Sequence, residues 1–177
     1  NGQPVTPVLD GLVASGEALR VDPAYACIGY TAPSIRQAFW GGFARREKTL
    51  LHDLKDAGWY TATVSGQDES WSDIASDSGL VDCDFYEDTR QDDPKHVLGG
   101  VRRIHRVLWS FEHFITARPK DRPFFLYMNL QDCHFPYDGA SEEIIYHDLP
   151  RNPALGRDNA DGLWRLYVNQ AANVDRG

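Results

Sequence analysis

Residues 29–42 read GYTAPSIRQAFWGG, and this stretch predicts a helix that begins near Thr31 and ends at Gly41. Pro33 suits the first turn of a helix, where its missing N–H costs nothing, and glycine commonly follows the last helical residue. Thr31 then lies among unpaired backbone N–H groups at the positive end of the helix dipole. A tetrahedral anion binds well at such a place, and a hydroxyl there can attack it. The same residues also allow a structural interpretation, in which Thr31 only caps the helix and Ser34 faces solvent.

Apolar periodicity predicts further elements on both sides of this stretch. Helical spacing of apolar residues indicates helices at 5–15, 49–57, 97–117 and 161–174. Continuous or β-rich apolar runs indicate strands at 59–64 and 124–130, and residues 17–26 are interpreted as a strand interrupted by a turn at Asp22–Pro23. The sequence therefore predicts one α/β domain over residues 1–177, with a mostly parallel sheet flanked by helices on both faces.

Two polar side chains follow predicted strands. Gln67 comes just after the strand at 59–64, and His134 comes just after the strand at 124–130. Open α/β sheets place their sites at the carboxyl ends of strands, so both residues are candidates for binding or proton transfer. The alternative for His134 is a structural histidine that is satisfied by Asp132.

Charge and composition exclude several classes of function. The net charge of −8 argues against non-specific binding to nucleic acid and to an anionic membrane surface. No run of apolar residues approaches the length of a membrane span. The three cysteines, Cys27, Cys83 and Cys133, lack the spacing of a metal site, and their odd number rules out a fully paired intramolecular framework.

Two charged segments have simple structural interpretations. The acidic residues between 82 and 93 match no EF-hand spacing, so the sequence favours a solvated loop over a Ca²⁺ site. The basic residues Arg102, Arg103 and Arg106 favour a solvated helix face over a phosphate site.

Three stretches in the correct order resemble the alkaline phosphatase and sulfatase superfamily. Thr-Ala-Pro-Ser at 31–34, with Gly41 ten residues after the Thr, is similar to the nucleophile segment, in which Cys or Ser, any residue, Pro, Ser and Arg open a helix. Residues 6–12, TPVLDGL, resemble the segment just upstream of the nucleophile. Residues 123–137, PFFLYMNLQDCHFPY, resemble a later strand followed by Asp-x-His-x-Pro-Tyr.

This resemblance implies an alkaline-phosphatase-like fold and a hydrolase or transferase acting on phosphate or sulfate esters. It implies Thr31 as the nucleophile and a metal ligand, His134 as a second catalytic residue, and Gln67, Ser34 and Arg36 as substrate contacts. It also implies a divalent metal (Zn, Mn, Mg or Ca). Family members carry metal-binding Asp residues upstream and further ligands downstream, so we expect this chain to be an incomplete domain, inactive by itself, with most metal ligands outside it.

The departures from the family pattern favour phosphate over sulfate. Formylglycine, the nucleophile of sulfatases, is made from Cys or Ser, whereas position 31 is Thr. Ile35 stands where Arg is expected, and Gln67 stands where the family has Lys. A Thr nucleophile is similar to that of phosphoethanolamine and phosphoglycerol transferases of the superfamily.

Two alternatives stay open: an arylsulfatase-type hydrolase, and a catalytically inactive binding or structural module. We expect a small-molecule or lipid or glycan ester as the substrate and no nucleic acid. Membrane contact is expected only through segments outside the sequence. The sequence leaves the compartment and the oligomeric state open.

Overall fold

The computed structural model describes residues 4–26, 28–92, 104–135, 137, 144–149 and 154–176. The chain divides into two compact units. Unit 1 combines residues 1–24 with residues 131–177, and unit 2 is the continuous segment 25–130.

A parallel sheet forms the centre of unit 2. Its strands are β1 (Tyr60–Ser65), β2 (Phe85–Glu87) and β3 (Phe124–Asn129). Their order is β2-β1-β3, and β1 pairs in parallel with both neighbours. All three strands therefore end at the same edge of the sheet, which confirms the strands predicted at 59–64 and 124–130 and the parallel arrangement.

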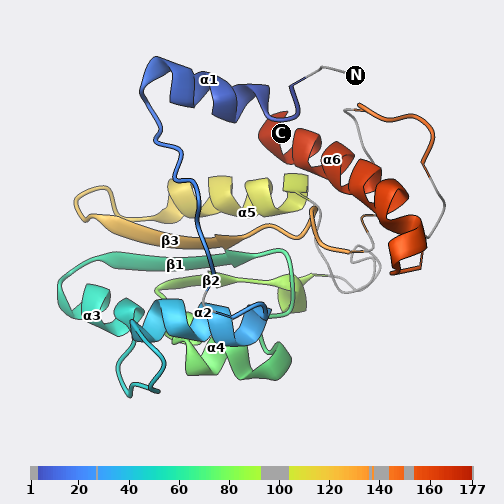
Figure 1. The fold of residues 1–177 in the computed structure, drawn as a ribbon. Coiled ribbons are helices and arrows are strands. Elements are labelled where there is room, and N and C mark those ends of the chain that lie inside the picture. The colour runs from blue at the N-terminus through green and yellow to red at the C-terminus, as the bar shows by residue number, and fades with distance from the viewer. Residues whose placement is uncertain are drawn as a thin grey trace. The chain divides into compact units, whose positions relative to one another are not determined.

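Helices cover both faces of this sheet (Figure 1). The helices α2 (Thr31–Trp40), α3 (Leu50–Asp56) and α4 (Ile74–Asp77) lie on one face, and α5 (Ile104–Ala117) lies on the other. Short 3₁₀ helices occur in the connections at Trp71–Asp73, Leu80–Asp82 and Thr89–Gln91. The predicted placement of helices on both faces is confirmed, while residues 97–103 of the predicted fourth helix lie outside the described residues.

Each face of the sheet has its own apolar core. On the face of α5, the fully buried ring of Phe114 packs on Tyr60, Phe85 and Phe124, with centroid distances of 6.2, 5.6 and 5.4 Å. The opposite core is formed by Ala32, Phe39, Leu51, Ile74, Ala75 and Leu80. Burying one large apolar side chain stabilises a fold by about 1.5–3 kcal/mol, so these clusters hold the helices to the sheet.

The central strand β1 is the most buried strand, although it contains hydroxyl residues. Thr61, Thr63 and Ser65 are all fully buried. Their hydroxyls contact Asp84, Cys83 and Glu69 respectively. A near-continuous apolar run such as 124–130 is typical of a strand buried on both faces, but β3 is only partly buried and its Met128 is 39% exposed. The difference arises because β3 pairs with a neighbour on one side only among the described residues.

Helix α2 has the predicted ends. It starts at Thr31, after Tyr30 in an extended conformation, and it stops at Gly41, which adopts a left-handed φ of 69°. A residue with a Cβ is disfavoured at such a φ, so Gly41 terminates the helix at low cost. Pro33 is the third helical residue.

Unit 1 is held together by the helices α1 (Pro7–Ser15) and α6 (Ala160–Arg176), which confirms the helices predicted at 5–15 and 161–174. The carboxylate of Asp175 accepts hydrogen bonds from the backbone N–H groups of Val8 and Leu9, both at 2.9 Å. A carboxylate at this place satisfies first-turn donors of α1 and complements its dipole. A 3₁₀ turn at Arg157–Asn159 precedes α6.

A second contact in unit 1 joins α6 to the segment at 145–146. The buried side chain of Asn169 accepts from the N–H groups of Ile145 and Tyr146, both at 3.0 Å, and donates to the Tyr146 carbonyl at 2.9 Å. The buried residues Ile145, Val168 and Ala172 form the small core beside it.

The strand predicted at 17–26 is wrong. The described residues 17–26 are irregular, and the side chains of Leu19, Val21 and Tyr25 are 88%, 67% and 86% exposed. Among the described residues no strand pairs with this segment, so its few apolar side chains gain nothing from an extended backbone. Among the described helices, none has the length and the apolar character needed to cross a membrane.

Candidate functional site

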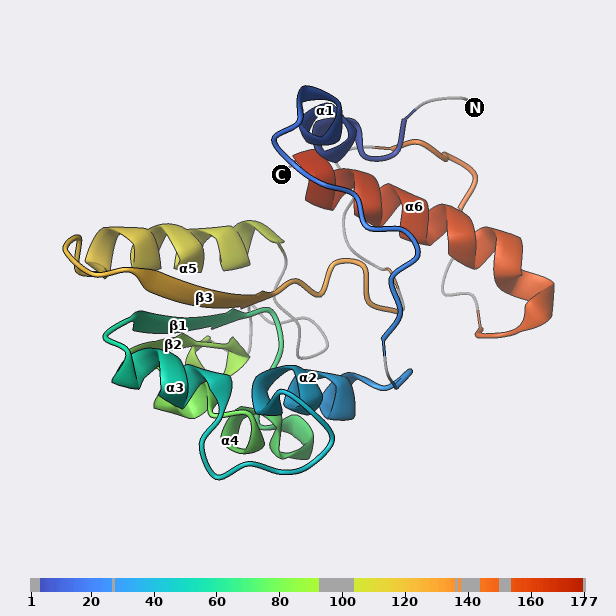
Figure 2. The same cartoon turned by 60° about the vertical axis from the view of Figure 1, so that its left-hand side comes forward.

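The carboxyl edge of the sheet brings the candidate residues of unit 2 to one side. Both views show α2 beginning on the side towards which the strand arrowheads point (Figure 2). Thr31 is the first residue of α2 and is exposed. The side chain of Tyr30, the residue before the helix, makes no capping hydrogen bond. Thr31 therefore combines an accessible hydroxyl with the electropositive end of a ten-residue helix.

Two other predicted site residues hold α2 in place. The hydroxyl of Ser34 donates to the carbonyl of Ile28 at 2.7 Å, so Ser34 is not the solvent-facing residue of the structural interpretation. The guanidinium of Arg36 forms an ion pair with Asp77 at 3.0 Å and also donates to the carbonyl of Ser72. These contacts fix the start of α2 and join it to the region of α4. Substrate contact by either residue stays a prediction.

Gln67 belongs to a buried polar cluster at the end of β1. Its side-chain nitrogen donates to Oε2 of Glu69 at 3.1 Å, and Glu69 is fully buried. The other oxygen, Oε1, accepts from the hydroxyl of Ser65 at 2.6 Å and from the amide nitrogen of Asn129 at 2.8 Å. Because Ser65 ends β1 and Asn129 ends β3, Glu69 ties the two strand ends together.

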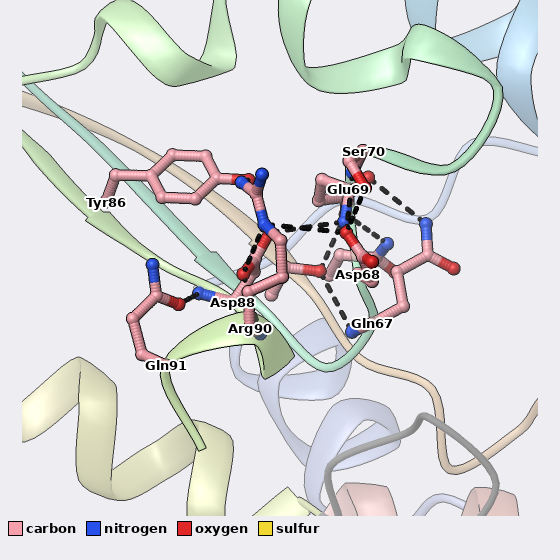
Figure 3. Close-up of polar contacts among 10 residues, drawn as sticks. Gln67, Asp68, Glu69, Ser70, Tyr86, Asp88, Arg90 and Gln91 are labelled. Atoms are coloured by element: carbon pink, nitrogen blue, oxygen red, sulfur yellow. Dashed lines mark hydrogen bonds and ion pairs between the residues drawn. The ribbon is translucent and has the colours of Figure 1, made fainter. Parts of the chain in front are cut away.

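A second buried carboxylate, Asp88, follows β2 (Figure 3). It accepts from the Glu69 backbone N–H at 3.2 Å, from the Tyr86 hydroxyl at 2.5 Å, and from the backbone N–H and Nε of Arg90, both at 2.9 Å. Burial alone would raise the pKa of Asp88, but these hydrogen bonds outweigh it and hold the pKa below its ordinary value. Burial, together with the Asp88 charge, raises the pKa of Tyr86, so Tyr86 is a hydrogen-bond donor at neutral pH.

His134 lies in unit 1 and is exposed. Its Nδ1 lies 2.6 Å from the carbonyl oxygen of Phe135, rather than bonding to Asp132 as the structural alternative has it. Because a carbonyl only accepts, Nδ1 carries the proton and Nε2 is the nitrogen left for proton transfer. Thr31 belongs to unit 2, so the pairing of Thr31 with His134 stays a prediction.

The acidic segment is not the solvated loop that the sequence favours. Asp84 accepts from the backbone N–H of Thr61 at 2.9 Å, Asp92 forms an ion pair with Arg106 at 2.9 Å, and Glu87 contacts His113 at 2.9 Å. Fixed backbone donors and cations make it favourable to bury these carboxylates. Asp93, Arg102 and Arg103 lie outside the described residues.

Within the described ranges, no group of three or more His, Cys, Asp or Glu side chains could hold a metal ion. The described residues therefore do not fit a metal centre of their own. Burial raises the pKa of both Cys83 and Cys133, and both are free thiols. Neither is a thiolate at neutral pH, so neither cysteine has the lowered pKa that marks a reactive thiol.

Sequence reasoning missed the buried members of the cluster. The position of Asn129 at the carboxyl end of a strand could have indicated it, by the same rule that selected Gln67 and His134. Glu69 gives no such signal, because its partner Asn129 is 60 residues away in the chain.

The Sulfatase family model matches residues 1–177. The chain belongs to the sulfatase family. This match confirms the resemblance to the alkaline phosphatase and sulfatase superfamily that pointed to the candidate residues. A search of curated proteins finds no match.

Solved structures share the fold of this sulfatase-family chain. The lipoteichoic acid synthase LtaP from Listeria monocytogenes matches with a TM-score of 0.67 and 18% identity, over 99% of this chain and 45% of that chain. The C-terminal periplasmic domain of EptC from Escherichia coli, in a complex with Zn, matches with a TM-score of 0.60 and 17% identity, over 99% of this chain and 51% of that chain. Another structure of the same EptC domain gives a TM-score of 0.64 with 17% identity, over 99% of this chain and 50% of that chain. The chain thus spans about half the length of these structures, and the expected alkaline-phosphatase-like fold is confirmed.

Proposed function

We propose that this sulfatase-family chain is part of an enzyme that hydrolyses or transfers phosphate esters through a covalent ester on Thr31. The observation that carries the proposal is the position of Thr31. An exposed hydroxyl opens α2 beside the carboxyl edge of a parallel sheet, where the helix dipole favours an anionic phosphoryl group.

In the proposed first step, the Thr31 hydroxyl oxygen attacks the phosphorus atom of the ester. The bond from phosphorus to the alcohol oxygen breaks as the bond from phosphorus to the Thr31 oxygen forms, and the Thr31 hydroxyl proton passes to solvent. The departing alcohol takes a proton from Nε2 of protonated His134, while Nδ1 of the ring stays bonded to the Phe135 carbonyl. Water or an acceptor alcohol then gives a proton to Nε2 of His134 and attacks phosphorus, and the bond from phosphorus to the Thr31 oxygen breaks as Thr31 takes a proton from solvent.

Threonine at position 31 also supports phosphate over sulfate chemistry, because formylglycine is made from Cys or Ser. LtaP, which shares the fold, is a lipoteichoic acid synthase. We therefore propose a phosphate ester linked to a lipid or glycan as the substrate class. A divalent metal is part of the proposal through the family alone, and no step above is routed through it.

The experiment is the substitution Thr31→Ala in the intact parent protein, with phosphate mono- and diesters as substrates. We expect turnover to fall at least a thousandfold while the circular dichroism spectrum and the urea midpoint stay those of the wild type. The matched control is Thr116→Ala, which makes the same change at an exposed hydroxyl of α5 and should leave turnover unchanged. If the Thr31→Ala variant still turns over these esters, Thr31 is not the nucleophile. Wild-type protein that turns over no ester and binds no divalent metal supports the inactive module instead.

A further inference from the structure

Gln67 stands where the resembling family has a lysine, and its surroundings determine which end of its amide is offered to a ligand. The Glu69 carboxylate is fully buried, and the partners of its two oxygens are Ser65, Asn129 and Gln67. All three partners are neutral donors. The carboxylate therefore depends on these hydrogen bonds for stabilisation, and losing one is costly.

The orientation of the Gln67 amide follows from this demand. A carboxylate only accepts, so the Gln67 nitrogen must face Glu69, at the observed 3.1 Å, and the Gln67 oxygen must point away from it. The backbone of Gln67 is fixed as well, because its N–H donates to the Ser65 hydroxyl at 3.1 Å and its carbonyl accepts from the Thr89 N–H at 3.4 Å.

The charges around Gln67 favour a donor over an anion. Asp68, Glu69 and Asp88 are carboxylates, and Arg90 is the cation that contacts Asp68 and Asp88 (Figure 3). An anionic oxygen that approached the second hydrogen of the Gln67 nitrogen would also approach the Glu69 carboxylate bonded to that nitrogen. A hydroxyl or an ammonium group that approached the Gln67 oxygen would instead meet an acceptor in a negative field.

We propose that buried Glu69 is a positioning residue that holds Gln67 with its carboxamide oxygen outward, so that position 67 binds a hydrogen-bond donor on the alcohol part of the substrate. The donor is a hydroxyl or an ammonium group, and the transferring phosphoryl group is bound elsewhere. This inference rests on the proposed function, and it reverses the role that the family lysine implies for this position.

The orientation of the Gln67 amide can be tested by an experiment that does not depend on enzymatic activity. In the ¹⁵N-labelled intact parent protein, we expect the side-chain protons of Gln67 to exchange with water at least tenfold more slowly than those of Gln37, whose side chain has no hydrogen bond in the described structure. In Glu69→Gln, the new amide accepts from Ser65 and Asn129 and turns its own nitrogen to Gln67. The Gln67 amide then inverts, and its exchange accelerates to the rate of Gln37.

Glu112→Gln makes the same chemical change on the exposed side of α5 and is the matched control, in which Gln67 exchange stays at the wild-type rate. Wild-type Gln67 protons that exchange as fast as those of Gln37 overturn the proposal. So does Gln67 exchange that is unaffected by Glu69→Gln in a folded protein.

The substrate part of the proposal is tested in the intact parent protein with Gln67→Met, which keeps the length of the side chain and removes the acceptor. The probes are glycerol 1-phosphate, O-phosphoethanolamine and 4-nitrophenyl phosphate, whose alcohol parts carry a hydroxyl, an ammonium group and no donor. We expect KM to rise about ten times more for at least one of the first two esters than for the nitrophenyl ester, and the affected ester identifies the donor.

Equal changes for all three esters overturn the proposal, because they place position 67 on the shared phosphoryl group. Wild-type protein that turns over none of the three contradicts the proposed function, while the exchange experiment still decides the orientation of Gln67.

Discussion

The substitution Asp88→Asn tests whether the polar cluster at the carboxyl edge stabilises unit 2. Asp88 is fully buried and accepts hydrogen bonds from Glu69, Tyr86 and Arg90. Asparagine has nearly the same shape but keeps only one acceptor oxygen, and its NH₂ group faces the remaining donors. At least one buried donor then loses its partner.

The magnitude follows from those contacts. An unsatisfied buried donor costs about 1–3 kcal/mol, and losing the charge of a bonded carboxylate costs a similar amount. Arg90 is 41% exposed, so water compensates part of its loss. We expect the free energy of unfolding to fall by about 2–4 kcal/mol. With an m value of about 2 kcal/mol/M in urea, the midpoint falls by about 1–2 M.

Urea unfolding followed by circular dichroism and tryptophan fluorescence measures this change. The matched control is Asp56→Asn, which makes the same substitution at an exposed carboxylate paired with Lys48. That midpoint should stay close to the wild-type value, because an exposed ion pair contributes little. If the two variants unfold at the same urea concentration, the buried hydrogen bonds of Asp88 do not stabilise the fold and the reasoning is refuted.

Two further predictions concern other parts of the chain, and a third concerns the pH dependence of the Asp88 contribution. Gly79→Ala should destabilise unit 2 by about 2–4 kcal/mol, because φ is 74° and a Cβ would lie 2.6 Å from the Thr49 hydroxyl oxygen. Gly58→Ala is the control, because its φ of 86° is similar but no atom lies within 4 Å of the added Cβ. It should lower the free energy of unfolding by only about 1 kcal/mol in the same urea assay. Asp175→Asn should lower the free energy of unfolding by about 1 kcal/mol and accelerate hydrogen exchange of the first-turn amides of α1. Unchanged exchange of these amides would contradict the capping role of Asp175. The depressed pKa of Asp88 adds stability above the unfolded pKa of about 3.9, and this contribution is lost as the pH falls through the folded value. The difference in unfolding free energy between the wild type and Asp88→Asn should therefore shrink below about pH 4, and a constant difference from pH 7 to pH 2 would disprove the linkage.

Local patterns were sufficient for most elements of the fold. Gly41 predicts the end of α2, and the apolar spacing at 161–174 predicts the bounds of α6 to within a few residues. The apolar run at 124–130 predicts β3. Such patterns failed at 17–26, where a segment with the apolar residues Leu19, Val21 and Tyr25 pairs with no strand in the described structure. Strand formation needs a partner, and periodicity carries no information about one.

The candidate site was predicted only in part, for a related reason. Thr31, Gln67 and His134 follow from their positions at a helix start and at strand ends. Glu69 could not be found in this way, because its burial depends on donors from two strands that are far apart in the chain. The same limit applies to the acidic segment. Its charge predicts a solvent-exposed Asp88, whereas in the structure Asp88 is buried and accepts hydrogen bonds from Tyr86 and Arg90.

The bond between Asp175 and the start of α1 has a consequence for the order of folding. It joins groups 167 residues apart, and the two segments of unit 1 enclose the whole of unit 2 along the chain. Unit 2 is continuous and can form while a ribosome is still adding residues, whereas α1 must wait for α6 to emerge before its first turn is capped. Pulse-labelling during synthesis should therefore find the sheet protected well before the N-terminal helix.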